Sequence, residues 1–172
     1  INKKKGIDLI FESFSILVEK NKFKTIKLII AGPIDNYNIE FKELQERFQH
    51  ANILILPSVI SVEKNYLFSK VNSFLLPSYS EGFSIAALEA ISYGKSCIFS
   101  ENIGFSKEAF KNDSVLICDL NVKSLEEKMS LLINDKDLNV LLSINSRNFF
   151  LMNYQIDDIA QRYYNEIILS NE

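Results

Sequence analysis

Two carboxylates stand eight positions apart in the sequence, Glu81 in a turn of small residues and Glu89 in the apolar run that follows. Residues 84–93 are small or apolar apart from Glu89, and Gly94 comes next, which predicts a helix that packs against a sheet and ends at the glycine. A carboxylate in such a low-dielectric position needs hydrogen-bond donors, or it takes up a proton. Ribose hydroxyls would serve, and so would a backbone amide or a nearby Lys or Arg. Spacing alone leaves both interpretations open.

The turn before this helix has the features of an anion site. The backbone amides of Gly82, Phe83 and Ser84 are expected at the helix N-terminus, where unpaired N–H groups and the helix dipole attract negative charge. Gly82 has no Cβ, so a phosphate could approach the chain closely. The alternative is an ordinary strand-to-helix turn with a solvated Glu81. The amides and the two carboxylates together favour a ligand that carries a diphosphate and sugar hydroxyls.

This segment closely resembles the signature of one enzyme family, the group 1 (family 4) retaining glycosyltransferases, in the C-terminal domain of their GT-B fold. The matching positions are Pro77-Ser78, Glu81-Gly82-Phe83, Leu88-Glu89-Ala90 and Gly94. The resemblance extends over most of the chain through Lys5-Gly6-Ile7-Asp8, the apolar run 28–31 that leads into Gly32, and Gly104 with Glu108 and Ala109. It implies an α/β fold, a Rossmann-like parallel sheet flanked by helices, with further helices at the C-terminus.

The resemblance also implies a role for each matching residue. Lys5 would contact the donor diphosphate, the amides of Gly82 and Phe83 would hold it, and Glu89 would hold the ribose. Glu81 would bind a hydroxyl of the transferred sugar near the reacting centre. A cation and aligned amides stabilise the charge that grows on a departing diphosphate, so this set of residues calls for no metal and no other cofactor.

The chain departs from the family pattern at several positions. The family's Arg, a few residues before its Lys at the end of a strand, has no counterpart, because the chain begins at Ile1. We therefore expect one nucleotide-sugar-binding domain over residues 1–172, truncated at its N-terminus by one strand, without the acceptor-binding N-terminal domain. Pro57 stands where the family has Gly in a loop near the nucleotide base, which leaves base selectivity open, and Ser96 replaces a common Pro.

Composition fits one globular domain and argues against several classes of protein. The 172 residues are 47% hydrophobic with a formal net charge of -3, which gives no sign of a nucleic-acid surface. Cys97 and Cys118 lie in apolar runs, so buried reduced thiols are expected, as in a cytoplasmic protein. The single histidine, His50, is expected at the end of a helix, and with two separated cysteines it makes no zinc site.

No apolar run is long enough to span a bilayer. The resemblance allows peripheral association of the full-length enzyme with the inner face of the membrane, because many acceptors of the family are lipid-linked.

Hydrophobic periodicity predicts alternating helices and parallel strands. The first helix carries an apolar face of Ile7, Ile10, Phe11, Phe14, Leu17 and Val18. Strands are expected at 26–31, 53–56, 73–76, 97–100 and 115–118, with helices at 40–50, 62–70, 84–93 and 106–111. Ligands of such sheets lie beyond the carboxyl ends of the strands, and the signature follows the strand 73–76, so it lies at that edge.

Three helices are expected to close the chain. The first would begin with a capping box of Ser124 and Glu127, and the others would span 138–150 and 156–168. The aromatic residues of this region and the apolar stripe of the last helix, which includes Tyr163, fit core packing better than a membrane surface. The resemblance implies that some of them contact the N-terminal domain.

The sequence thus predicts the donor-binding domain of a retaining glycosyltransferase, which moves a sugar from a nucleotide-diphosphate donor to an acceptor hydroxyl in surface polysaccharide or glycoconjugate synthesis. Glu81 and Lys5 would be its catalytic residues, and a glycan or lipid-linked glycan its acceptor. The isolated chain is expected to bind donor without turning it over. The alternatives are another GT-B sugar-nucleotide enzyme, such as an epimerase, and a non-catalytic nucleotide-sugar-binding module, which would have little use for Glu81.

Overall fold

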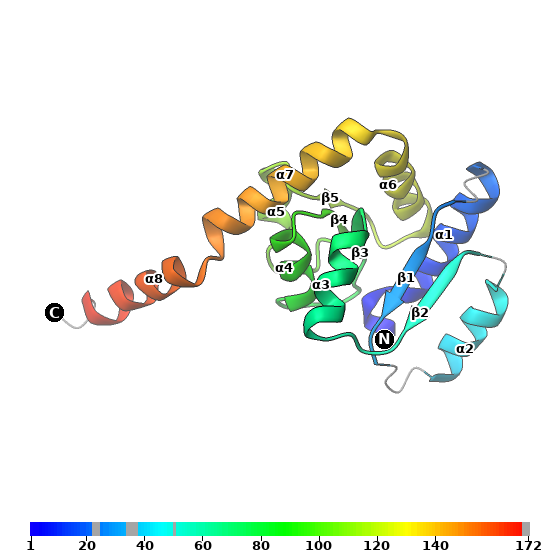
Figure 1. The fold of residues 1–172 in the computed structure, drawn as a ribbon, viewed down its shortest axis with the longest axis horizontal. Coiled ribbons are helices and arrows are strands. Elements are labelled where there is room, and N and C mark those ends of the chain that lie inside the picture. Colours follow the sequence, from blue (N-terminus) through cyan, green and yellow to red (C-terminus); the bar gives the residue numbers. More distant parts are fainter. Residues whose placement is uncertain (22–24, 34–37, 50, 170–172) are drawn as a thin grey trace.

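The structure is a computed structural model that describes residues 1–21, 25–33, 38–49 and 51–169. Helices and strands alternate along the chain, as predicted, until three consecutive helices close it (Figure 1). In order, the elements are η1 (Lys3–Lys5), α1 (Ile7–Asn21), β1 (Leu28–Ala31), α2 (Asn38–Arg47), β2 (Ile53–Leu56), α3 (Ser61–Lys70), β3 (Ser73–Leu76), α4 (Ile85–Ser92), β4 (Ser96–Phe99), α5 (Ser106–Lys111), β5 (Leu116–Ile117), α6 (Val122–Asn134), α7 (Lys136–Asn153) and α8 (Ile156–Leu169).

The parallel strands form two sheets. β1 pairs with β2 in one sheet, and the other has the order β3-β4-β5. Within the described residues no ladder joins β1 to β3. The N-terminal residues lie near this gap, because the amino group of Ile1 donates to the carbonyl of Pro33, beyond β1, and Tyr79 N–H, beyond β3, donates to the carbonyl of Lys4 at 2.8 Å. The predicted α/β fold with parallel strands is confirmed, with the sheet in two parts.

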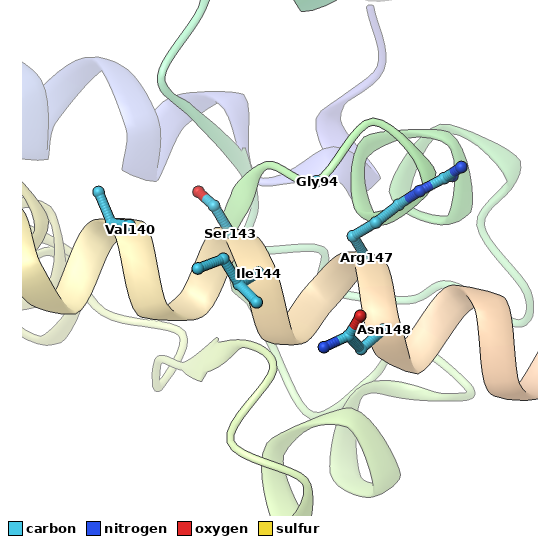
Figure 2. Close-up of a pocket in the computed structure, with 6 residues that line it drawn as sticks. All are labelled: Gly94, Val140, Ser143, Ile144, Arg147 and Asn148. Atoms are coloured by element: carbon cyan, nitrogen blue, oxygen red, sulfur yellow. The ribbon is translucent and has the colours of Figure 1, made fainter.

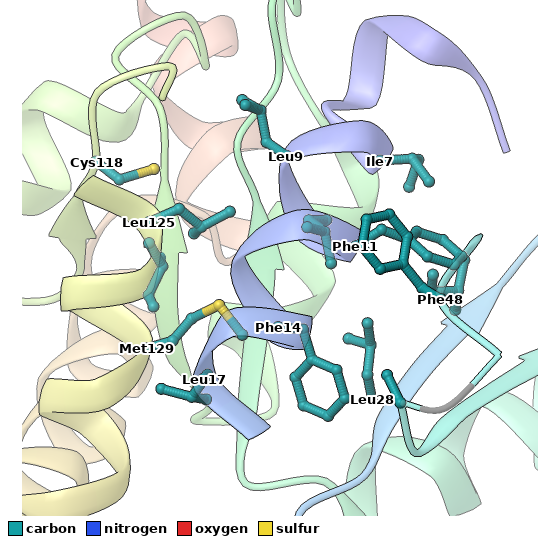
Figure 3. Close-up of a cluster of buried hydrophobic side chains, with 14 of the residues drawn as sticks. Ile7, Leu9, Phe11, Phe14, Leu17, Leu28, Phe48, Cys118, Leu125 and Met129 are labelled. Carbon is teal, nitrogen blue, oxygen red and sulfur yellow. The ribbon is translucent and has the colours of Figure 1, made fainter. Parts of the chain in front are cut away.

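α1 is the centre of the larger core cluster. Its predicted apolar face is confirmed, since Ile7, Ile10, Phe11, Phe14 and Leu17 are all buried and Val18 packs against them. Figure 3 shows this face between Leu28 of β1 and the α6 side chains of Leu125 and Met129. The core thus fixes α1 against β1 on one side and α6 on the other, which sets where the residues just before α1 lie.

The predicted packing of α4 is confirmed for one face. Ala87, Ala90 and Ile91 are buried in the second core cluster, whereas Ile85 is 62% exposed. Gly94, with φ of 61°, ends the helix region as predicted, and its N–H donates to the carbonyl of Ile91 at 3.0 Å. α4 is therefore anchored along one side and exposed at its first turn.

Both cysteines are buried and free, as predicted. Burial raises the pKa of the Cys97 thiol far above its usual range. Burial, with Asp119 nearby, raises the pKa of the Cys118 thiol to about 11. These thiols are part of the packing.

The last two helices differ in how much they bury. α7 packs across α4 and β4 and buries Leu142 and Phe149. α8 extends away from the body of the domain (Figure 1), and its residues 156–167 are all exposed. The prediction that its stripe packs in the core is wrong for this chain, since Tyr163 is 64% exposed. The stripe lies outside both core clusters because α7 carries α8 away from them.

Two local predictions at helix ends differ from the structure. The capping box is wrong, because Asn121 caps α6 by accepting from Ser124 N–H at 2.8 Å, while Ser124 Oγ accepts from Asp119 N–H at 3.0 Å. Asn is at least as good an N-cap as Ser, and Asn121 has the extended backbone that an N-cap needs. α2 ends at Arg47, and His50 lies outside the described residues.

Candidate functional site

Lys5 is placed by a short capped segment. Asn2 caps η1 by accepting from Lys4 N–H at 2.9 Å, and Gly6 ends it with φ of 69°. A Cβ at Gly6 would clash with the carbonyl oxygen of Pro77, so only glycine lets the segment lie this close to the loop after β3. The sequence Lys5-Gly6 therefore fixes the lysine next to the signature turn.

A second set of contacts fastens the same segment to the loop after β3. The carbonyl of Lys4 accepts from Tyr79 N–H and from Ser78 Oγ, each at 2.8 Å. The Tyr79 hydroxyl donates to Asp8 Oδ2 at 2.8 Å, and Asp8 Oδ1 is a buried oxygen with no hydrogen-bond partner among the described residues. Two stretches of chain more than 70 positions apart are thus held as one unit.

Lys5 and Glu81, the two predicted catalytic residues, form an ion pair in which Lys5 Nζ donates to Glu81 Oε2. The Glu81 side chain is 16% exposed and that of Lys5 is 39% exposed. The alternative of a solvated Glu81 is therefore wrong. The structure brings a cation and a carboxylate together at the carboxyl end of β3, the edge at which ligands of parallel sheets bind.

The glycine turn is open on one side and supported on the other. A Cβ built on Gly82 would meet no atom within 4 Å, and its φ is not in the left-handed region. Its carbonyl accepts from Gly104 N–H at 2.7 Å, and a Cβ on Gly104 would lie 2.7 Å from that same oxygen. Packing thus requires glycine at position 104, whereas neither packing nor backbone strain requires it at position 82.

The loop after β4 supports the turn at two more points. Ser100 Oγ donates to the carbonyl of Ser78 and Asn102 Nδ2 to the carbonyl of Tyr79, both at 2.7 Å. These donors satisfy the carbonyls of Ser78 and Tyr79, so the segment that leads to Glu81 and Gly82 is fixed to the loop after β4.

The side chains of Ser84 and Phe83 have structural contacts. Ser84 is buried and caps α4 by accepting from Ala87 N–H at 3.3 Å. The half-exposed ring of Phe83 lies 5.5 Å from that of Phe105 and 5.9 Å from that of Tyr154, measured between centroids. Any ligand contact of the kind predicted for these two residues would therefore come from the backbone.

Glu89 pairs with a lysine that the sequence analysis missed. Lys64 Nζ lies 2.5 Å from Glu89 Oε1, and the two side chains are 33% and 31% exposed. The lysine partner named as one interpretation is present, and contact of Glu89 with ribose hydroxyls stays a prediction. The structure does not bring Glu89 into contact with Lys5 or Glu81. Lys64 comes from α3, 25 positions earlier, and no sequence signal indicates this contact.

A groove of about 370 Å³ lies away from these residues, between α7 and the end of α4 (Figure 2). It is lined by Gly94, Val140, Ser143, Ile144, Arg147 and Asn148. The Arg147 guanidinium donates to the carbonyl of Ser92, which links α7 to the end of α4. None of the predicted site residues lines the groove.

Over residues 1–21, 25–33, 38–49 and 51–169, no three His, Cys, Asp or Glu side chains cluster in a way that could hold a metal ion. In the same part of the chain, no helix combines the length and the apolar character needed to cross a membrane.

Comparison with known sequences gives one family. The family model described as "Glycosyl transferases group 1" matches residues 1–149. A Campylobacter jejuni N,N'-diacetylbacillosaminyl-diphospho-undecaprenol alpha-1,3-N-acetylgalactosaminyltransferase is 30% identical over 161 residues, which are 92% of this chain and 40% of that protein. The Staphylococcus aureus capsular polysaccharide biosynthesis glycosyltransferase CapM is 27% identical over 149 residues, 86% of this chain and 38% of that protein. The chain thus spans less than half the length of these two relatives.

Solved structures share the fold. The C-terminal domain of the Francisella tularensis group 1 glycosyltransferase LpcC matches with a TM-score of 0.80 at 18% identity, over 91% of this chain and 83% of that one. Anabaena HepE, solved in complex with UDP, matches with a TM-score of 0.84 at 13% identity, over 96% of this chain and 46% of that one. Because the family model covers most of the chain and the fold agrees, this chain belongs to the group 1 glycosyltransferases and has the fold of the C-terminal half of a GT-B enzyme.

Proposed function

We propose that this chain is the donor-binding half of a retaining glycosyltransferase, which transfers a sugar from a nucleotide-diphosphate donor to an acceptor hydroxyl. The observation that carries the proposal is the turn at Gly82, where glycine is not required by the fold and the space beside the backbone is open. The Lys5–Glu81 pair stands next to this opening. A phosphate that approaches the turn is the simplest reason for a glycine there.

Each residue has a part in the proposed reaction. The amides of Gly82, Phe83 and Ser84 hold the diphosphate, and Lys5 neutralises the charge that develops on it as the bond to the anomeric carbon breaks. Lys5 then shares its ammonium between the diphosphate and Glu81, its present partner. Glu81 orients a hydroxyl of the transferred sugar, and Glu89 accepts from the ribose. The proposal needs no metal.

Related proteins support a sugar nucleotide as the donor. HepE, which shares the fold, has been solved with UDP and with UDP-glucose. The Campylobacter relative is named as an N-acetylgalactosaminyltransferase that acts on a sugar carried by diphospho-undecaprenol. We propose the same broad classes here, a nucleotide-diphosphate sugar as donor and a glycan or lipid-linked glycan as acceptor. The acceptor is bound largely by the other half of the full-length enzyme, which works in the cytoplasm at the inner face of the membrane.

Thermal unfolding with a panel of nucleotides tests the donor site. UDP, GDP, ADP, CMP and their common sugar conjugates are added to the full-length protein and to its Glu89→Ala variant. A ligand at about 100 times its dissociation constant that binds only the folded protein adds roughly 2.7 kcal/mol of stability. We expect one diphosphate to give a clear shift that shrinks in the variant. If no nucleotide shifts the full-length protein, the proposed function is wrong.

A further inference from the structure

Three neighbouring side chains fasten α3 to α4. Lys64 Nζ lies 2.5 Å from Glu89 Oε1, and the hydroxyl of Tyr93 donates to Asn65 Oδ1. The ring of Phe68 stacks on that of Tyr93, with centroids 4.7 Å apart and planes 9° apart. Phe68 is itself buried, so the helix that carries Lys64 is anchored. Lys64 therefore reaches Glu89 from a fixed backbone.

The pair differs from an ordinary surface ion pair in how it uses the carboxylate. Exposed pairs of flexible side chains contribute little, because solvent screens them and both side chains lose freedom. Here about two thirds of each side chain is covered, and Lys64 engages Oε1 of Glu89. Within the described residues, no group donates a hydrogen bond to Glu89 Oε2. One oxygen is held by protein while the other keeps its full capacity to accept hydrogen bonds.

The distance along α4 from the turn to Glu89 suits a ribose that follows a diphosphate bound at the turn. Glu89 is five residues beyond the N-cap Ser84, so its backbone is about 7.5 Å further along the helix than the turn. Ile85 lies one turn nearer on the same face and is 62% exposed, so the first turn of α4 is open to solvent on this face. A hydroxyl donor on a ligand that extends from the turn along α4 can therefore approach Glu89.

We infer that Lys64 is a positioning residue for donor binding, which holds Glu89 Oε1 so that Oε2 is presented to the ribose hydroxyls. The inference rests on the proposed function, because it takes Glu89 as the ribose contact. Lys64 acts through Glu89 and need not touch the reacting atoms. Without Lys64 the Glu89 carboxylate can rotate, and binding of a ribose must then order it at a cost in conformational entropy.

Titration calorimetry on the full-length protein with UDP and 2′,3′-dideoxy-UDP tests this role, with the GDP and ADP pairs run alongside. We expect the wild-type protein to prefer the ribonucleotide and Glu89→Ala to remove that preference. We expect Lys64→Met to weaken binding of the ribonucleotide about tenfold and to leave dideoxynucleotide affinity unchanged, so the preference shrinks. Lys64→Arg should restore most of it. Lys70→Met, at the other end of α3, is the matched control and should match wild type.

The outcomes separate this inference from the proposed function. Equal weakening of the binding of both ligands in Lys64→Met would show that Lys64 serves only the fold or the net charge. Tighter ribonucleotide binding in this variant would show that Lys64 competes with the ribose for Glu89. Either result overturns the inference. A preference that is lost in Glu89→Ala but intact in Lys64→Met also overturns it and leaves the proposed function standing. If wild type binds no nucleotide, or binds both forms equally, the assignment of Glu89 fails and the inference fails with it.

Discussion

Gly82 and Gly104 are hydrogen-bonded to each other, yet packing requires glycine only at position 104 of these two. Gly104 lies against the carbonyl of Gly82, while Gly82 faces open space. At the scale of single residues, this difference separates a glycine required for packing from one available for a ligand.

We expect Gly82→Ala to leave the free energy of unfolding unchanged or to raise it by up to about 1 kcal/mol, because an added methyl meets no protein atom and restricts the unfolded chain. The same methyl should weaken nucleotide-diphosphate binding by about 1–3 kcal/mol, since it occupies the space proposed for phosphate. Denaturant melts and calorimetry measure the two effects. Gly104→Ala is the control and should destabilise the protein by about 1–3 kcal/mol. Normal nucleotide affinity in Gly82→Ala would contradict the proposed phosphate contact.

The two members of the Lys5–Glu81 pair should have separable effects on the full-length enzyme. Glu81→Ala is expected to lower transfer by about 100-fold or more and to leave binding of the free nucleotide diphosphate nearly intact, because the role proposed for Glu81 is to orient the sugar. Lys5→Met should weaken binding of the diphosphate by about 1.5–3 kcal/mol, since a charge-assisted contact is lost. Steady-state rates and calorimetry of each variant measure this. Equal losses of transfer and nucleotide binding in Glu81→Ala would remove the role given to Glu81.

At the scale of elements, the start of α6 depends on Asn121. We expect Asn121→Ala to lower the free energy of unfolding by about 1 kcal/mol, because the N–H of Ser124 loses its acceptor. Glu127→Ala should cost less than about 0.5 kcal/mol, since its side chain is exposed and its ion pair with Lys123 is long, at 3.9 Å. Urea melts of both variants distinguish the cap seen in the structure from the predicted capping box. A larger loss in Glu127→Ala would favour the capping box.

At the scale of the whole molecule, the gap between the sheets leaves one side of β1 without a ladder to any of the described residues. Leu28 and Gly32 donate to carbonyls on the β2 side at 3.0 and 3.3 Å, so the intervening N–H groups of Ile29 and Ala31 face the other edge. We propose that a further parallel strand of the full-length protein pairs there and joins β1 to β3.

Hydrogen exchange of the full-length protein tests this strand. We expect the amides of Ile29 and Ala31 to be protected about as strongly as those of Leu28 and Ile30, which face β2, because a ladder on both sides closes both sets of donors. Ala31 is exposed in the structure, so strong protection of its amide would indicate a partner strand on that side. Exchange of Ile29 and Ala31 as fast as that of loop amides would rule out the added strand.

The sequence alone determined what depends on local pattern. The periodic apolar face of α1, the glycine that ends the α4 region and the strand-to-helix turn at Gly82 were all predictable, because each follows from the preferences of residues close together in the chain. The family also followed from the signature around Glu81 and Glu89. The segment Lys5-Gly6-Ile7-Asp8 was also identified from the sequence, because it was part of the resemblance.

Tertiary structure decided what depends on residues far apart in sequence. The pairing of Lys5 with Glu81 spans 76 positions and that of Lys64 with Glu89 spans 25, and neither spacing carries a signal. The exposure of α8 likewise could not be read from its stripe, because an amphipathic helix has the same pattern whether or not a partner covers it. Periodicity shows which side chains are apolar, whereas the packing of whole elements decides which of them become buried and which charges meet.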